Sequence, residues 1–305
     1  MIQFDKIKLA APLYTISDIQ HNFFLTKTER NTTISEIYKS KSAHVYVELN
    51  YPAEEVVIEM TGKILGSHYP ALISLDTIRE CFDNINRLGI CCLDCESILV
   101  NAQVLKVDVT LDVDCGEWKD FASDFVGQVR NHNHYLVRKI ANNIIVETNV
   151  KKDKLRLTVY DKGKEMEYAA NQRFLEELEN KNDIMDYFKG KTRFEMNIVN
   201  KKKILSTLQV ASNRMLDVVQ AETNPIRNFL DKILDAGDVA PEIETLSDYK
   251  NYLLLQSCDF DIKKVEFTLR RYCGYNYRYQ LDKIRAMLPL SPAANFKSRL
   301  LQLVS

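Results

Sequence analysis

Residues 106–114 read KVDVTLDVD, and this run carries the strongest structural signal in the sequence. Aliphatic residues alternate strictly with polar ones, a pattern typical of a β-strand with one apolar and one polar face. The polar face carries Asp108, Thr110, Asp112 and Asp114. Like charges along one strand face repel each other, so this row of acids requires solvent, a cation or basic partners.

Two later segments repeat the pattern. Residues 155–162 (LRLTVYDK) place Arg156, Thr158 and Tyr160 on one face, and residues 192–198 (TRFEMNI) do the same for a second polar set. That second set consists of Arg193, Glu195 and Asn197. Each of the three strands therefore combines a polar face with an apolar one.

If these strands are neighbours in one sheet, Asp108, Tyr160 and Glu195 converge on the face that helices leave free. Carboxylates are the hard oxygen ligands that Mg²⁺ or Mn²⁺ prefers. A tyrosine beside such a metal is a candidate nucleophile on phosphorus. The alternative is a sheet with one solvated face and no site, as many α+β proteins have.

The rest of the chain predicts further elements by its periodicity. We expect strands at 44–51, 55–60, 98–113, 134–147, 154–161 and 192–199, and helices at 74–88, 117–130, 168–180 and from Lys201 onward. In the first helix, Ser74 suits the N-cap and Gly89 the C′ position. This order predicts an α+β fold of antiparallel sheet units covered by helices on one face, and it raises the hypothesis of a duplicated unit.

The character of the sequence changes beyond Pro225. Residues 226–235 and 246–305 show helical spacing with almost no strand pattern, and 237–242 (GDVAPE) read as a linker. We therefore predict an α+β catalytic domain over 1–224 and a helical, basic region over 225–305.

Charge is unevenly distributed along the chain. The 305 residues include 41 Lys and Arg against 42 Asp and Glu, a net charge of -1 that as an average argues against a polyanion partner. Residues 262–305, however, hold nine basic and two acidic residues, a charge of +7, which leaves -8 for the remainder. Seven of these basic residues are candidate DNA-binding residues: Lys263, Lys264, Arg270, Arg271, Arg278, Lys283 and Arg285.

Four tyrosines interleave with these cations, at 272, 275, 277 and 279. Basic and aromatic side chains together suit phosphate contact and base stacking. The alternative is a solvated amphipathic helix pair with tyrosines in its core.

The N-terminal residues MIQFDKIKLAAPLY include Asp5 and no long apolar run, which is not typical of a signal peptide or a membrane span. We expect a cytoplasmic protein without a membrane partner. The seven cysteines contain one CxxC, Cys92 to Cys95, and no second pair at zinc-finger distance. We expect free, mostly buried thiols.

The ordered set of motifs resembles a known family. Asp108-Val-Thr-Leu-Asp112, then Tyr160-Asp161-Lys162-Gly-Lys164-Glu165, then Arg193-Phe-Glu195, is similar to phage and plasmid replication initiators of the gene-II/X type and to trans-acting rolling-circle plasmid initiators. The upstream run 60–66 (MTGKILG) fits the same pattern, and the resemblance covers roughly residues 40–215. Such proteins nick one DNA strand at an origin, become linked to its 5′ phosphate through tyrosine, and later rejoin the ends.

The resemblance implies roles for individual residues. Tyr160 would be the nucleophile, with Arg193, Lys162 and Lys164 as further catalytic residues near the phosphate or the tyrosine. The implied ligands of a divalent Mg²⁺ or Mn²⁺ are Asp108, Asp112, Asp161 and Glu195. In an ideal strand Asp161 faces away from Tyr160, unless the strand ends or bulges there. The implied partners are origin DNA, single-stranded or hairpin, and host helicase or replication proteins.

A competing constellation lies at residues 130–139. His132 and His134 would share a face of a strand, as paired metal-binding histidines do, and Tyr135 with Lys139 repeats the Tyr-xxx-Lys spacing. The alternative is an exposed turn that enters a strand. These residues are the second choice for nucleophile and ligands.

Two other functions compete with DNA nicking. One is a sequence-specific DNA-binding protein of the same ancestry without catalysis, which would show steep salt dependence and no nicking. The other is an intracellular protein-interaction domain with no role on nucleic acid.

Overall fold

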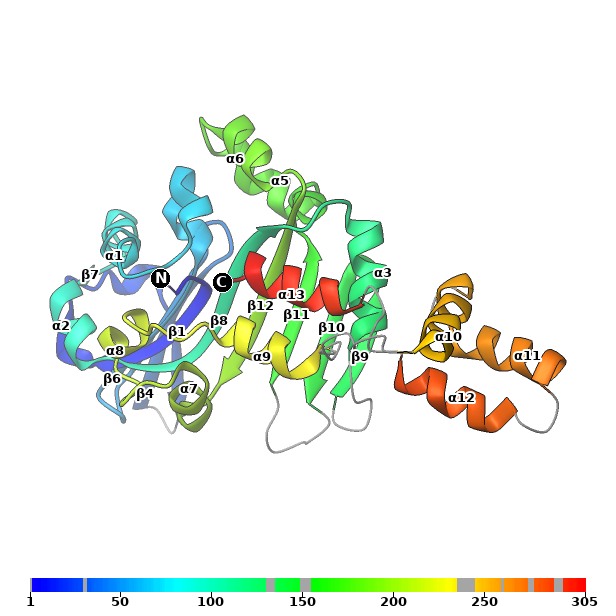
Figure 1. Cartoon of the computed structure of the whole chain (residues 1–305). Helices are drawn as coiled ribbons and strands as arrows, with labels where there is room; N and C mark the ends of the chain where they lie inside the picture. The colour runs from blue at the N-terminus through cyan, green and yellow to red at the C-terminus, as the bar shows by residue number, and fades with distance from the viewer. Residues whose placement is uncertain are drawn as a thin grey trace.

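The computed structural model describes residues 2–29, 32–129, 135–148, 155–234, 245–258, 261–273, 277–287 and 293–305. In this part of the chain, ten strands form one antiparallel sheet in the order β3-β4-β5-β6-β1-β8-β12-β11-β10-β9 (Figure 1). Their bounds are β1 Phe4–Pro12, β3 Leu25–Glu29, β4 Thr32–Ser40, β5 Val45–Asn50, β6 Glu55–Thr61, β8 Gln103–Asp114, β9 Tyr135–Ile140, β10 Asn143–Thr148, β11 Arg156–Asp161 and β12 Lys191–Val199. A short separate pair joins β2 (Ile16–Ser17) to β7 (Cys92–Leu93). The predicted α+β class is confirmed.

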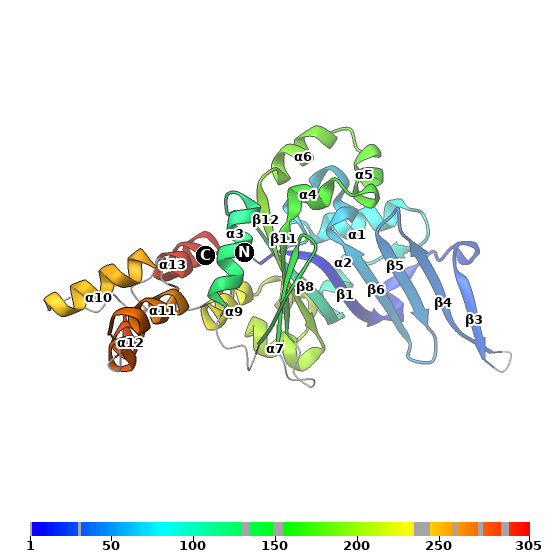
Figure 2. The same ribbon diagram turned by 90° about the vertical axis from the view of Figure 1, so that its right-hand side faces the viewer.

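The two halves of the sheet have the same strand order when each is followed inward from its outer edge. One half runs β3-β4-β5-β6-β1 and the other β9-β10-β11-β12-β8, and β1 pairs with β8 at the centre. In both halves the first strand in the sequence pairs with the last. This topology is what a duplicated unit would produce, although the halves share one continuous sheet (Figure 2).

The apolar face of the sheet carries the main core. Val107, Phe194, Met196 and Ile198 are fully buried there. Among the described residues, seven helices contribute to this core: α1 (Ile78–Arg87), α2 (Cys95–Asn101), α3 (Trp118–Gln128), α7 (Lys201–Leu208), α8 (Met215–Val219), α9 (Pro225–Ile233) and α13 (Ala293–Leu303). The polar faces of the central strands therefore point away from these helices.

Part of the polar face is covered as well, which the sequence did not predict. The covering segments are the 3₁₀ segment η3 (Gly62–Ala71) and the helices α4 (Lys162–Met166), α5 (Ala169–Glu176) and α6 (Lys181–Phe188), together called the cover. Tyr69, Met166, Phe174 and Phe188 form a second hydrophobic core inside it. The cover lies over one end of β11 and β12 (Figure 2).

The C-terminal helices do not form one unit over 225–305. Helices α9 and α13 belong to the main core, where Phe296 of α13 lies 5.9 Å from Phe121 between ring centroids. Helices α10 (Leu246–Ser257), α11 (Ile262–Cys273) and α12 (Tyr277–Ala286) have a core of their own, beyond the β9 edge in Figure 1. We call these three helices the helical module.

Several boundaries differ from the sequence prediction. Residues 98–101 are helical because Asp94 caps α2 by accepting a hydrogen bond from the Ser97 backbone. Helix α1 begins at Ile78 instead of Ser74, and the predicted linker 237–242 lies outside the described residues. The seven cysteines, all in the described part, are free, and three are buried. Within the described ranges no helix is long and apolar enough to cross a membrane.

Candidate functional site

The three strands with predicted polar faces, β8, β12 and β11, are neighbours in the sheet, which is the condition for their polar side chains to meet. Strand β12 pairs with β11 on one side and with β8 on the other. Arg193 lies opposite both Tyr160 and Asp112, while Asn197 lies opposite Asp108. The register thus places the three predicted polar sets side by side on one face.

Tyr160 and Glu195 are in direct contact on this face. The Tyr160 hydroxyl donates a hydrogen bond to Glu195 Oε2 at 3.1 Å, and both residues are half-buried. Burial, and then the negative charge of Glu195, raise the pKa of Tyr160 well above its usual value. Tyr160 is therefore a neutral phenol with a carboxylate beside it as a proton acceptor.

The pKa of Glu195 is suited to that role. Burial raises it to about 7, and the negative charges of Asp5 and Asp108 act in the same direction. Burial also raises the pKa of Asp108, which accepts a hydrogen bond from the Asn197 amide and lies 4.0 Å from the Lys106 ammonium. A carboxyl group with a pKa near 7 exchanges protons readily at neutral pH.

Arg193 is fully buried beneath the cover. Its Nε and Nη2 donate to the two carboxylate oxygens of Asp112, each at 2.6 Å, and its Nη1 donates to Asp5 at 2.8 Å and to the Tyr69 hydroxyl at 3.0 Å. The bidentate geometry matches the planar guanidinium to the carboxylate. The resemblance implied a place for Arg193 near a phosphate, but in this arrangement its donors are bound within the protein.

Lys162 is buried beside Arg193. Its ammonium donates to the Tyr69 hydroxyl at 2.9 Å and to Glu165 at 2.6 Å. Burial, and then the charge of Arg193, lower the pKa of Lys162. Since its side chain is only 2% exposed, Lys162 joins the cover to the sheet and does not face a substrate. We call Arg193, Lys162, Asp112, Asp5, Tyr69 and Glu165 the Arg193 cluster.

Asp5 and Tyr69 are members of this cluster that sequence reasoning missed. The pairing of β1 with β8 shifts register between Phe4 and Lys6, so Asp5 sits at an irregularity of the strand. Burial would raise the pKa of Asp5, but Arg193 and Lys162 outweigh burial and lower it. For Asp5, the sequence offered one signal, an acidic residue inside a strand-like run. For Tyr69, which lies in a 3₁₀ segment, the sequence offered no signal.

Two of the predicted metal ligands have other structural roles. Asp161 ends β11 and caps α4, accepting a hydrogen bond from the Lys164 backbone at 3.0 Å, and the Lys164 side chain is exposed. Asp112 is bound to Arg193 as described above. Across the described ranges, no three His, Cys, Asp or Glu side chains gather closely enough to hold a metal ion. As arranged here, the four carboxylates do not fit a metal centre.

Tyr135, the second-choice nucleophile, does not join this face. Tyr135 packs its ring at 5.6 Å from that of Phe229 in α9, on the apolar side of the sheet. Its partner in the β9–β10 register is Thr148. His132 and His134 lie outside the described residues.

The seven candidate DNA-binding residues all lie on α11 and α12, and they are exposed.

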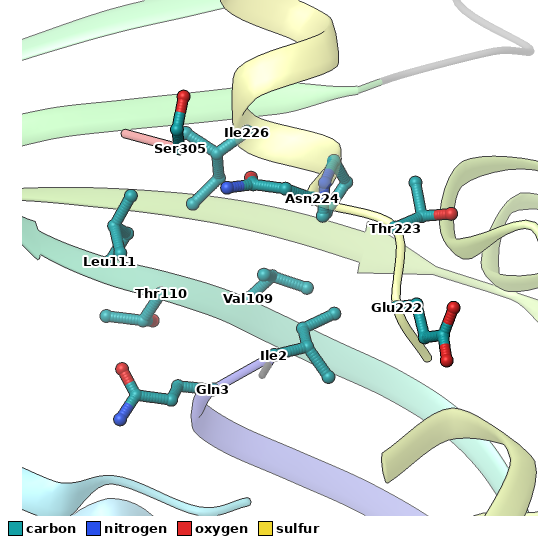
Figure 3. A pocket seen from close by; sticks show the side chains of 11 residues that line it. Ile2, Gln3, Val109, Thr110, Leu111, Glu222, Thr223, Asn224, Ile226 and Ser305 are labelled. Carbon is teal, nitrogen blue, oxygen red and sulfur yellow. The ribbon is translucent and has the colours of Figure 1, made fainter. Parts of the chain in front are cut away.

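Elsewhere, a pocket of about 200 Å³ lies between β8, the residues that lead into α9, and the C-terminus (Figure 3). Its lining includes Ile2, Val109 and Ile226 but no member of the Tyr160 pair or the Arg193 cluster. The candidate site is therefore the polar sheet face around Tyr160 and Glu195.

Comparisons with models of protein families, with curated proteins and with solved structures find no match to this chain.

Proposed function

We propose that this protein nicks and rejoins one strand of DNA through a covalent bond between Tyr160 and a 5′ phosphate, as in the initiation of replication of a mobile element or phage. The observation that carries the proposal is the hydrogen bond from the Tyr160 hydroxyl to Glu195. It joins a nucleophile to a base on an antiparallel sheet whose strand motifs resemble those of replication initiators.

In the first step the Tyr160 oxygen attacks phosphorus and its proton passes to Glu195. The bond between phosphorus and the 3′ oxygen breaks, and that oxygen leaves with the electron pair and takes a proton from water. The phosphotyrosyl ester conserves the energy of the phosphodiester bond. In the reverse step a 3′ hydroxyl attacks phosphorus and gives its proton to water. The bond between phosphorus and the Tyr160 oxygen breaks, and that oxygen leaves with the electron pair and takes the proton back from Glu195.

The carboxylates do not fit a metal centre in this arrangement, so no step is assigned to a metal. A divalent cation remains part of the proposal as an expectation from the resemblance. Chelation by EDTA tests it directly, because nicking that persists in EDTA would remove the cation from the mechanism.

Incubation with a labelled single-stranded DNA pool of random sequence, followed by a denaturing gel, tests the function. We expect a protein–DNA adduct with the natural chain and none with Tyr160→Phe. Tyr14→Phe is the matched control, because Tyr14 is 72% exposed and lies outside the site. An adduct that persists in Tyr160→Phe would overturn the assignment.

A non-catalytic DNA-binding protein of the same ancestry is the second candidate. The raised pKa of Tyr160 and the internal pairing of Arg193 and Lys162 favour it, since each limits catalysis in this arrangement. DNA binding without an adduct under Mg²⁺ or Mn²⁺ would select this candidate.

A further inference from the structure

The helical module carries a strong positive charge on two of its helices. Helices α11 and α12 contain seven basic and two acidic side chains, a net charge of +5. The acids are paired locally, Glu266 with Arg270 at 2.6 Å and Asp282 with Arg285 at 3.4 Å. The remaining charge is complementary to a polyanion.

The same two helices expose large aromatic rings. Phe267 is 70% exposed, Tyr272 is 74% exposed and Tyr279 is 64% exposed. Phe267 is two residues from both Val265 and Leu269, the buried residues of α11. In a helix this spacing puts Phe267 on the opposite side from them. Tyr279 has the same relation to the buried Leu281 of α12. The Phe267 and Tyr279 rings are therefore directed away from the core of the module, and Tyr272, next to the last residue of α11, is exposed to solvent.

Cations lie beside the rings. Arg271 is 5.6 Å from the Tyr272 ring centroid, and Lys283 is 4.8 Å from that of Tyr279. Arg270 of α11 lies 5.1 Å from the Tyr277 ring, so that contact links the two helices. Each pair offers an aromatic face for a base together with a positive charge for the adjoining phosphate.

Exposed rings distinguish single strands from a duplex. In a duplex the base faces are stacked on each other, so protein rings gain little and affinity follows charge alone. In a single strand the base faces are accessible, and each stacked base adds to affinity without sequence preference. The alternative prediction, that these tyrosines lie in the core of a helix pair, is wrong for Tyr272 and Tyr279, because both are exposed.

We propose that the α11–α12 surface binds single-stranded DNA, with Phe267, Tyr272 and Tyr279 as stacking platforms and the neighbouring Arg and Lys side chains as phosphate contacts. This deepens the proposed function, on which it rests for the choice of DNA: a strand displaced by nicking would be held by the same chain that cut it.

Fluorescence anisotropy of the full chain with labelled oligothymidylate, and with a duplex of equal length, tests the proposal. We expect tighter binding to the single strand. Each change among Phe267→Ala, Tyr272→Ala and Tyr279→Ala should weaken it about 5- to 150-fold while leaving duplex binding unchanged. Tyr14→Ala is the control, an exposed tyrosine outside the module.

Several outcomes would overturn the proposal. They are equal losses on single strand and duplex, no loss in any of the three variants, and tighter binding to oligouridylate than to oligothymidylate. The Tyr160→Phe variant separates this proposal from the proposed function. Tyr160→Phe should bind oligothymidylate as tightly as the natural chain does. This result would support the stacking surface even if the natural chain formed no covalent adduct.

Discussion

Replacement of Arg193 by Met is expected to lower the free energy of unfolding by about 3–5 kcal/mol. Arg193 is fully buried, and the side chain of its partner Asp112 is 3% exposed. The guanidinium carbon of Arg193 lies 5.6 Å from the Tyr69 ring centroid and 5.3 Å from that of Phe188, and Met keeps an unbranched side chain of nearly this length but removes every donor. The carboxylate of Asp112 is then left buried without its cation, which is the costly part of breaking such a pair.

Equilibrium unfolding in urea measures the change. Arg79→Met is the matched control, because Arg79 makes the same kind of contact with Glu96 at 2.8 Å on the surface, where solvent screens it; we expect no measurable change. The double variant Arg193→Met with Asp112→Leu should recover much of the loss, since it removes both charges together.

Two results would refute the reasoning about this pair. One is a loss in Arg193→Met of less than about 1 kcal/mol, which is typical of a surface ion pair. The other is a double variant whose loss equals the sum of the two single losses, because independent side chains would behave in that way.

Three further predictions concern neighbouring residues. Asp161→Ala should cost about 1 kcal/mol in urea unfolding, whereas Asp161→Asn should keep both stability and adduct formation, because Asn also caps helices; loss of adduct in Asp161→Asn would favour a metal ligand. The pKa of Glu195 is about 7 in the folded protein, against an ordinary value of 4.5. Between these two pH values the folded state binds more protons than the unfolded state. The free energy of unfolding therefore falls as the pH rises from 4.5 to about 7. Glu195→Gln should remove that fall, and a pH series of urea unfolding with an unchanged slope would contradict the assignment. Tyr69→Phe should cost about 1–3 kcal/mol, because Arg193 and Lys162 each lose a buried acceptor; thermal unfolding that matches the natural chain would refute this.

The sequence was sufficient to predict which side chains of each strand share a face. A period of two assigns Tyr160, Glu195 and Asp108 to the polar faces of their strands, but only the sheet order β8-β12-β11 shows that these strands are neighbours. Antiparallel neighbours then brought the Tyr160 hydroxyl within 3.1 Å of Glu195.

The roles of the charged residues depended on contacts distant in sequence. Arg193 meets Asp5, 188 residues away, and Tyr69, 124 residues away, so no local pattern could show that it is buried. The sequence Arg-x-Glu is the same whether its Arg contacts a phosphate or an internal carboxylate.

The predicted boundary at residue 225 does not separate the helical module from the rest of the chain, for a similar reason. Helical periodicity is the same for α13, which packs in the main core, and for α11, which does not. Truncation after residue 240 would therefore remove Phe296 and Leu300 from the core of the sheet. Point substitutions on α11 and α12 are the cleaner test of DNA binding.

Mapping of the peptide that carries a covalently bound nucleotide tests the central claim most directly. After reaction with single-stranded DNA and digestion by nuclease and protease, mass spectrometry should find the phosphonucleotide on Tyr160 alone, and the product should disappear in Tyr160→Phe. A nucleotide on another tyrosine, or no covalent product with either Mg²⁺ or Mn²⁺, would contradict the account.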